Sequence, residues 1–195
     1  MRKIAITGNI GSGKTTVCKI LKKTGFKVFE CDLEVKKLYK TINVKNKVKK
    51  MLGHKISNLF FSNGRINKKA LSDYIFSSPD ELRDLEMLIY ESLSEMKKRF
   101  CKMHSKERII FFDIPLLFEK RMENEYDQII YLKVEKEIQK KRVLKRKNID
   151  ENKYKSIIKN QADFSHSDKI SLLIDTANTK KQIKEKLLAH LNCSK

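Results

Sequence analysis

Long apolar runs are missing from this sequence of 195 residues, and its cysteines lack any metal-binding spacing. No stretch approaches the length of a membrane-spanning helix. Because a strand pattern begins almost at Met1, we expect no cleavable signal. Cys18, Cys31, Cys101 and Cys193 show no paired spacing, so we expect neither a zinc site nor a disulfide framework. Scattered thiols are typical of a reducing compartment, and a cytoplasmic protein without a membrane partner is therefore expected.

The four histidines stand alone in the sequence, and no internal repeat or low-complexity linker is present. None has a cysteine or a carboxylate pair at metal-ligand spacing, so we expect all four on the surface. A length of 195 residues, 40% of them hydrophobic, is enough for one α/β domain with a smaller inserted subdomain. The four positions are His54, His104, His166 and His190.

Arginine is scarce among the basic residues, although the net charge is +20. Only 8 of the 44 basic residues are arginine, and the lysines run along the whole chain without interleaved aromatic residues. Sequence-specific nucleic-acid readers depend on the arginine fork, and single-strand platforms depend on stacked aromatic rings. We therefore attribute the charge mainly to a lysine-rich composition, with a smaller role in attracting polyanionic substrates, and expect no nucleic-acid partner.

What the sequence does contain is a glycine-rich motif at residues 8–15, GNIGSGKT, which matches G-x-x-x-x-G-K-[ST] in full. An expected strand at 2–7 precedes it and an expected helix at 14–24 follows it, which is the context of a phosphate-binding loop. Glycines let backbone N–H groups turn inward around phosphate oxygens, and the helix dipole favours the same anion. Lys14 would reach the β- and γ-phosphates, and the Thr15 hydroxyl would bind Mg²⁺. The chain is thus expected to bind a nucleoside triphosphate.

Two aspartates follow or close expected strands. Residues 26–31 alternate as a strand and lead into Asp32, and residues 108–113 form a nearly continuous apolar strand that ends at Asp113. Ligands of open α/β sheets bind at the carboxyl edge. Asp32 is therefore expected to orient or deprotonate an acceptor hydroxyl, with a helix cap as the alternative. Asp113 is expected to hold Mg²⁺, often through water, with a turn or cap residue as the alternative.

Between these strands, residues 33–104 lose the strand pattern and indicate a helical insertion of the size of a substrate-covering subdomain. Apolar spacing predicts one helix over 33–42 and another around 48–52. Ser78-Pro79 is a helix start with proline at the first position, and a long amphipathic helix follows it. Four aromatic residues of this region are expected in its core: Tyr39, Tyr74, Phe76 and Tyr90.

A cation-rich segment follows an expected strand at 128–134. On the helix expected over 137–148, Arg142 and Arg146 are i and i+4 and share a face, as a lid closing over a transferring phosphoryl group requires. An ordinary charged surface helix is the alternative, and the spacing alone favours it. A strand at 171–175 and a closing helix complete the expected fold, an α/β protein with a parallel five-stranded sheet and helices on both faces.

Taken together, these motifs resemble those of the dephospho-CoA kinase family, the P-loop kinases that act last in coenzyme A synthesis. The resemblance covers nearly the full length and is strongest at the sheet edge. It implies a P-loop kinase fold and an ATP-dependent phosphotransferase that phosphorylates the ribose 3′-hydroxyl of dephospho-CoA. The matching pieces are ITGNIGSGKTT at 6–16, Cys31-Asp32, DIPLLFE at 113–119, the arginine pair of KKRVLKR at 140–146, Gln161 and the LLID strand.

The resemblance implies roles for individual residues, with ATP and Mg²⁺ as cofactors. Asp32 would accept or orient the proton of the 3′-hydroxyl, while Lys14 and Arg142 would stabilise charge during transfer. The partners would be ATP and dephospho-CoA, and the protein would be a monomer or a weak homo-oligomer. The nucleotide would be bound by Asn9, Ile10, Gly11, Ser12, Gly13, Lys14, Thr15, Thr16, Arg142 and Arg146.

Metal and substrate contacts also follow from the resemblance. Thr15 and Asp113 would hold the metal, and Asp32, Lys68 and Asp113 would contact the substrate. Lys68 stands where the family usually shows the arginine of an aspartate–arginine pair, so the bidentate fork is lost there. The implied organisation is a core of 1–32, 105–136 and 170–195, an insertion at 33–104 and a lid at 137–169.

Two other segments depart from the family pattern. Tyr90-Glu91 stands where a histidine–proline pair is common, and this bears on the substrate contacts. Asp175-Thr176-Ala177 lacks the asparagine and glycine often found there, and this bears on the contacts to the nucleotide base. Neither departure touches the residues expected to carry the transfer.

Two other functions would share part of this sequence pattern. Another small P-loop kinase, acting on a nucleoside monophosphate or a small alcohol, would share the loop and the arginine lid but not DIPLLFE. A nucleotide-dependent switch would need the guanine-reading motif N-K-x-D. The chain has N-K pairs at residues 46, 67 and 152, and each of them lacks the aspartate.

Overall fold

The structure is a computed structural model, and it describes residues 1–147 and 149–193, apart from the side chain of Cys193. The chain forms two compact units, one of Met1–Glu30 with His104–Lys195 and one of Cys31–Met103. Apart from Cys31 and Asp32, the segments expected as core and lid lie in the first unit, and nearly all of the expected insertion lies in the second. The thiol of Cys193 and the position of Asn148, the last residue of the expected helix over 137–148, lie outside the described residues.

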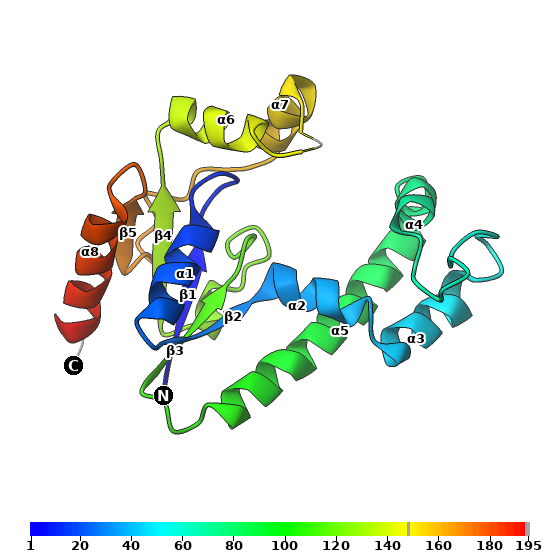
Figure 1. Cartoon of the computed structure of the whole chain (residues 1–195), viewed down its shortest axis with the longest axis horizontal. Helices are drawn as coiled ribbons and strands as arrows, with labels where there is room; N and C mark the ends of the chain where they lie inside the picture. Colours follow the sequence, from blue (N-terminus) through cyan, green and yellow to red (C-terminus); the bar gives the residue numbers. More distant parts are fainter. Residues whose placement is uncertain (148, 194–195) are drawn as a thin grey trace. The chain divides into compact units, whose positions relative to one another are not determined.

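The first unit is built on a parallel sheet of five strands in the order β2-β3-β1-β4-β5 (Figure 1). β1 is central, and its carboxyl end leads directly into the glycine-rich motif. Nearly continuous apolar runs form these strands because a parallel sheet is buried on both faces. The expected parallel five-stranded fold is confirmed. The strands are β1 (Arg2–Thr7), β2 (Lys27–Glu30), β3 (Ile109–Asp113), β4 (Gln128–Lys133) and β5 (Leu172–Asp175).

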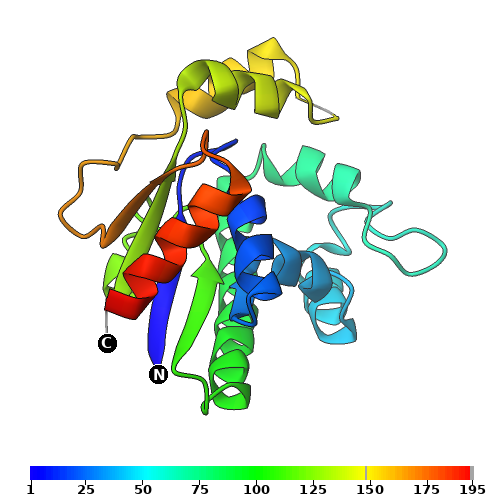
Figure 2. The same cartoon turned by 60° about the vertical axis from the view of Figure 1, so that its left-hand side comes forward.

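One face of this sheet is covered by α1 (Lys14–Lys23) and α8 (Lys180–Cys193), which also contact each other (Figure 2). Alternate strand residues such as Ile4, Phe111 and Ile130 join the apolar sides of both helices in one fully buried core. Burial of apolar surface contributes about 25 cal/mol per Å², so this core anchors the helix that begins at the glycine-rich motif.

Aromatic rings lie on the other face of the sheet. Phe112 alternates with Phe111 along β3, and its ring lies 5.8 Å from that of Phe29 and 5.4 Å from that of Tyr126, centroid to centroid. Tyr126 follows a short 3₁₀-helix, η1 (Glu123–Glu125). The chain then continues through β4 into α6 (Lys136–Leu144) and α7 (Glu151–Lys159), which make up the segment expected as a lid.

The second unit is helical and has its own apolar core. Hydrogen-bonding side chains begin two of its helices, because Thr41 accepts from the Val44 N–H and Asn67 accepts from the Ala70 N–H. Leu52 is among the fully buried residues of this core. The helices are α2 (Cys31–Leu38), α3 (Ile42–Leu52), α4 (Lys68–Ile75) and α5 (Pro79–Met103).

The expected strand over 26–31 is shorter in the structure. β2 ends at Glu30, and both Cys31 and Asp32 belong to the first turn of α2. Acidic residues in a first helical turn are favoured by the helix dipole, and Asp32 and Glu34 both lie in that turn. Asp32 therefore lies in a helix rather than at a strand terminus, which corrects the sequence-based placement.

The expected helix over 137–148 is also too long. α6 ends at Leu144, and Arg146 lies beyond it in a bend. The Arg146 N–H donates to the Val143 carbonyl. The prediction that Arg142 and Arg146 share one face of a helix is therefore wrong. Like charges at i and i+4 on a helix repel each other and destabilise it. The i, i+4 spacing of the two arginines therefore disfavours the continuous helix that was predicted from it.

Several predictions of burial and of helix bounds are wrong, most of them in the second unit. Phe76, at the C-cap of α4, is 81% exposed, and Tyr90, on α5, is 54% exposed, although both were expected in the core. Ile42 begins α3 rather than ending the preceding helix. Of the histidines expected on the surface, His104 and His190 are half-buried. Periodicity places a residue on a helix, but packing decides which of its sides is covered.

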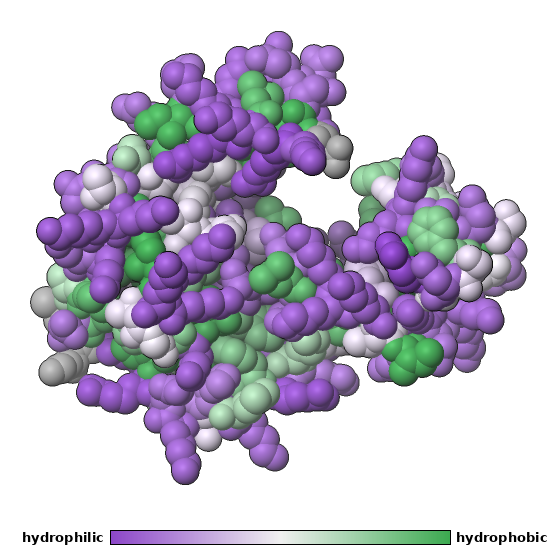
Figure 3. All heavy atoms as spheres, in the orientation of Figure 1, coloured by the Kyte–Doolittle hydropathy of each residue, from purple (hydrophilic) through white to green (hydrophobic). Residues whose placement is uncertain are grey.

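Among the helices that the structure describes, none combines the length and the apolar composition that a membrane span needs. Hydrophilic side chains predominate on the face drawn in Figure 3, with smaller hydrophobic patches between them. This distribution matches the dispersal of lysine along the sequence.

Leu52→Ala is expected to lower the free energy of unfolding by about 2–5 kcal/mol, because it leaves a cavity in the core of the second unit. Urea denaturation followed by circular dichroism measures the change. Ile42→Ala, in the same helix but at a position 73% exposed, is the control and should change the free energy by less than about 0.5 kcal/mol. Equal effects of the two substitutions would contradict this account of the core.

Candidate active site

The glycine-rich loop fits closely against the end of β4. Gly8 has a φ of 139°, and a Cβ at this position would collide with the carbonyl oxygen of Leu132. Gly13 has a φ of 92° and is the N-cap of α1, but it offers no side chain to cap the helix. The first N–H groups of α1 therefore face a position where an anion can accept their hydrogen bonds.

Lys14, the first residue of α1, folds back over this loop. Its Nζ donates to the Gly8 carbonyl and, at 3.3 Å, to the Asn9 carbonyl. The loop thus holds the Lys14 ammonium group close to the position where a phosphate would bind. Thr15 follows and is exposed, so its hydroxyl is open to a ligand.

Two glutamines hold the backbone of Ile10 in this loop. Gln139 of α6 is buried, and its Nε2 donates to the Ile10 carbonyl at 2.8 Å. Gln161, just after α7, accepts from the Ile10 N–H through Oε1 at 2.9 Å. Residues from both ends of the expected lid thus fix a peptide segment of the loop. Gln139 was not selected from the sequence, and no pattern in its surroundings singles it out.

The next two carbonyls of the loop are held by Arg142 and Thr176. Arg142 Nη1 lies 3.4 Å from the Gly11 carbonyl oxygen and donates to Thr176 Oγ1 at 2.9 Å, while Nη2 donates to the Thr176 carbonyl at 2.7 Å. Thr176 Oγ1 in turn donates to the Ser12 carbonyl at 2.8 Å. The guanidinium edge is therefore turned to the loop and β5, and Arg146 does not share its helix.

Tyr131 connects the start of the loop to the segment that follows α7, within the expected lid. Its hydroxyl lies 3.4 Å from both Asn9 Oδ1 and Asp163 Oδ1, and it accepts from the Phe164 N–H at 3.4 Å. Burial raises the pKa of Tyr131 to about 12. Phe118, from the DIPLLFE segment, stacks on Phe164 with ring centroids 4.9 Å apart. This group was not predicted from the sequence.

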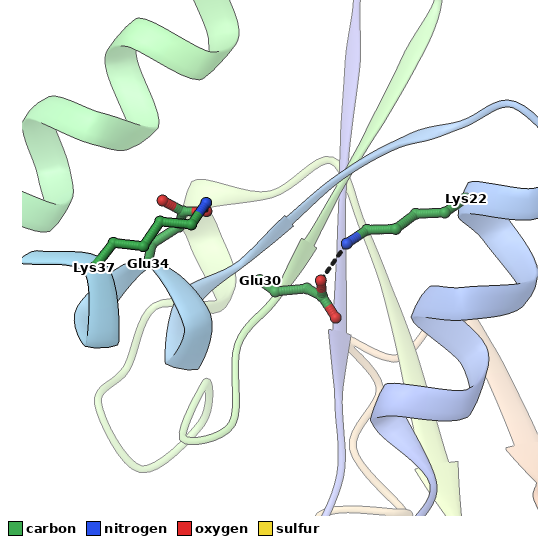
Figure 4. A network of polar contacts seen from close by, with 4 residues as sticks. All are labelled: Lys22, Glu30, Glu34 and Lys37. Atoms are coloured by element: carbon green, nitrogen blue, oxygen red, sulfur yellow. Dashed lines mark hydrogen bonds and ion pairs between the residues drawn. The ribbon is translucent and has the colours of Figure 1, made fainter.

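A second carboxylate accompanies Asp113 at the sheet edge. Asp113 and Glu30 are register partners at the ends of β3 and β2, and both are buried. Ligand atoms of Cys18, Glu30 and Asp113 all lie within 4.8 Å of one another. Lys22 of α1 forms an ion pair with Glu30 (Figure 4). Glu30 was missed from the sequence, although the rule that selected Asp113, a carboxylate closing a parallel strand, applies to it as well.

The environment of Cys18 is unfavourable to a thiolate. Burial, and secondarily the carboxylates of Asp113 and Glu30, raise the pKa of the Cys18 thiol well above its usual range. The two carboxylates are suitable ligands for a hard cation, which prefers oxygen. A metal that needs a thiolate ligand is disfavoured here, because the Cys18 thiol stays protonated.

The remaining predicted site residues belong to the second unit. Asp32 lies in the first turn of α2, and its side chain is exposed. On the same helix, Glu34 and Lys37 form an ion pair at 2.6 Å (Figure 4). Lys68 is the first residue of α4, and its Nζ lies 5.0 Å from the ring centroid of Tyr39, in a cation–π contact.

Comparison with known proteins shows the family of the chain. The family model described as dephospho-CoA kinase matches residues 2–182. The chain belongs to the dephospho-CoA kinase family. A dephospho-CoA kinase of Bartonella henselae is 30% identical over 191 residues, which cover 96% of this chain and 95% of that protein.

Solved structures extend the family likeness to the fold. A dephospho-CoA kinase from Campylobacter jejuni superposes with a TM-score of 0.68 at 22% identity, over 97% of this chain and 95% of the other. A Thermus thermophilus protein reaches a TM-score of 0.81 at 23% identity, over 99% and 97%. At these identities the superpositions show a shared fold, and the family match identifies this chain as a kinase with dephospho-CoA kinase function.

Within the dephospho-CoA kinase family, two departures now have structural settings. Lys68, at the position where the resemblance implied an arginine, lies against an aromatic ring, where a single ammonium is accommodated. Thr176 stands in the segment that lacks the usual asparagine and glycine, and it bonds to both Arg142 and the loop.

Cys18 is expected to react with a thiol reagent at least about 100-fold more slowly than Cys101 in the native protein, because its thiol is buried and its pKa is raised. Mass spectrometry of labelled peptides at pH 8 measures both rates. Raising the pH to 9 should leave Cys18 slow, since its pKa lies far above this range, and unfolding in guanidinium should remove the difference. Rapid native labelling of Cys18 would contradict its placement.

Proposed function

We propose that this chain transfers the γ-phosphoryl group of ATP to the ribose 3′-hydroxyl of dephospho-CoA, giving ADP and coenzyme A, with the residue roles described below. The observation that carries the proposal is the loop at residues 8–15, whose carbonyls at Ile10, Gly11 and Ser12 are each held by a side chain from elsewhere in the first unit. Because these carbonyls point away from the centre of the loop, the N–H groups of the same peptides point toward it, as the binding of an anion requires.

ATP would bind with its phosphates on the backbone of residues 9–16 and at the first turn of α1. Lys14, held by the carbonyls of Gly8 and Asn9, would exchange these contacts for the β- and γ-phosphate oxygens. Arg142 would stabilise the nucleotide from α6, and Arg146 would approach it from the bend that follows. The role of Arg142 is inferred from its contact with the Gly11 carbonyl and from the family, and the role of Arg146 from the family alone.

Mg²⁺ would be held by oxygen atoms of the first unit. Thr15 offers an exposed hydroxyl beside Lys14, and Asp113 and Glu30 offer two buried carboxylates in register. These oxygen donors fit a hard divalent cation, directly or through water. When bound, the ion neutralises negative charge on the β- and γ-phosphates. Its counter-charge would also relieve the repulsion between the two carboxylates.

Asp32 would receive or orient the proton of the 3′-hydroxyl during in-line transfer. This role is supported by the exposure of its carboxylate, by its position immediately after β2, and by the family match. Lys68 and Asp113 would contact dephospho-CoA. We further propose that the protein acts in the cytoplasm, as a monomer or a weak homo-oligomer, without a nucleic-acid or membrane partner.

The direct test is an assay of ADP release by the purified chain with ATP, Mg²⁺ and dephospho-CoA. Shikimate, deoxyadenosine and nucleoside monophosphates serve as competing acceptors. The proposal requires turnover with dephospho-CoA that exceeds turnover with every other acceptor. Preference for another acceptor would assign the chain to a different P-loop kinase activity.

Asp32→Asn is expected to lower kcat by about 10²–10⁴-fold, because the amide cannot take up the hydroxyl proton. The affinity for ATP, measured by calorimetry, should remain close to that of the wild type. Asp73→Asn, at an exposed position on α4 in the same unit, is the control. Normal turnover of Asp32→Asn would reduce Asp32 to a residue that only stabilises the start of α2.

Glu30→Gln is expected to raise the Mg²⁺ concentration for half-maximal activity roughly tenfold, because one of two adjacent carboxylates is neutralised. A Mg²⁺ titration of initial rates measures the effect. Glu81→Gln breaks another Lys–Glu ion pair, formed with Lys55 at 2.7 Å in the second unit, and should leave the titration unchanged. An unchanged Mg²⁺ requirement in Glu30→Gln would remove Glu30 from the proposed metal site.

A further inference from the structure

Thr176 follows the last residue of β5 and is 5% exposed. Its N–H donates to the Lys133 carbonyl at 2.9 Å and extends the pairing of β5 with β4 by one residue. The sheet therefore sets the position of the Thr176 backbone. A side chain that starts from so rigid a point can position the groups it touches.

The hydroxyl of Thr176 is the centre of a hydrogen-bonded chain. Oγ1 accepts from Arg142 Nη1 at 2.9 Å and donates to the Ser12 carbonyl at 2.8 Å, with the Lys133 carbonyl more distant at 3.3 Å. The Thr176 carbonyl accepts from Arg142 Nη2 at 2.7 Å. A charged donor at one end polarises the hydroxyl and strengthens its bond to the loop.

The bond to Ser12 also sets the orientation of the following N–H. In a trans peptide the C=O of Ser12 and the N–H of Gly13 point in opposite directions, so holding the carbonyl outward turns the Gly13 N–H toward the other side of the loop. Gly13 is the N-cap of α1, where an anion is favoured. A Cβ on Gly13 would lie 3.2 Å from the Thr176 side chain, so the two residues are already close-packed.

We propose that Thr176 is a positioning residue for the nucleotide: its hydroxyl orients the Ser12–Gly13 peptide toward the phosphates of ATP and couples that peptide to Arg142. The proposal rests on the proposed binding of ATP at this loop. Thr176 touches neither phosphate nor acceptor in this role, and it acts through the peptide and the guanidinium. It gives a function to a position where this chain departs from the family pattern.

Thr176→Val keeps the shape of the side chain and removes the hydroxyl. The Ser12 carbonyl then loses its donor, and Arg142 Nη1 loses one acceptor, while the bond from Nη2 to the backbone carbonyl remains. We expect the KM for ATP and its calorimetric dissociation constant to rise roughly tenfold, since one of the two lost bonds is charge-assisted. The KM for dephospho-CoA and kcat should change less than about twofold. Thr176→Ser retains the hydroxyl and should restore ATP affinity.

Thr179→Val is the matched control for this substitution. Thr179, like Thr176, lies between β5 and α8, and its hydroxyl donates to Gln182 Oε1 of α8 at 2.9 Å. Among the residues that the structure describes, its side chain forms no hydrogen bond with residues 8–15. Its loss should lower the melting temperature by an amount similar to that of Thr176→Val and leave the KM for ATP unchanged. An equal rise in KM for both variants would make the role of Thr176 purely structural and overturn the proposal. Thr176→Ala replaces the valine variant if the latter does not fold.

A double-mutant cycle with Arg142→Lys tests the coupling. If Thr176 acts partly through Arg142, the rise in KM for ATP caused by Thr176→Val should be smaller in the Arg142→Lys background than in the wild type. Independent, multiplicative effects would overturn the coupling. If the wild type fails to bind ATP or to phosphorylate dephospho-CoA, the proposed function fails together with this inference. If the wild type does both and Thr176→Val matches it, only the role of Thr176 fails.

Discussion

A loop that gathers N–H groups around an anion must direct its carbonyl oxygens elsewhere, and each buried carbonyl needs a donor. In this chain the donors come from far along the sequence: Gln139 holds Ile10, and Thr176 holds Ser12. An unsatisfied buried carbonyl costs about 1–3 kcal/mol, so these bonds stabilise the conformation in which the loop carbonyls are turned outward. The rest of the first unit is arranged so that these donors reach the loop.

The same bonds join the loop to the segment that would cover it. Gln139 lies on α6 and Gln161 follows α7, and the two side chains take the carbonyl and the N–H of Ile10. Any displacement of this segment must break or rebuild contacts with the loop. Changes in the covering helices and in the phosphate-binding backbone are therefore linked energetically within the first unit.

Two buried carboxylates and one lysine lie together at the ends of β2 and β3. Glu30 and Asp113 are buried side by side, and Lys22 balances one of them from α1. Two carboxylates so close, in a site shielded from water, repel each other, and a bound cation would relieve this repulsion. Their position at the carboxyl edge of β2 and β3, beside the strand that feeds the loop, is consistent with the proposed divalent metal at that edge.

The sequence by itself was enough for the parallel five-stranded fold, the phosphate-binding loop and the family, because these depend on short contiguous patterns. It also selected Asp113, since a carboxylate that closes an apolar strand is visible locally. It did not reveal Thr176, Gln139 or Tyr131 as partners of the loop. The hydrogen bond from Thr176 to Ser12 joins residues 164 positions apart, and only the strand order β1-β4-β5 brings them together. The start of α2 at Cys31, the end of α6 at Leu144 and the exposure of Phe76 were likewise decided by the helix dipole, charge repulsion and packing, which periodicity does not contain.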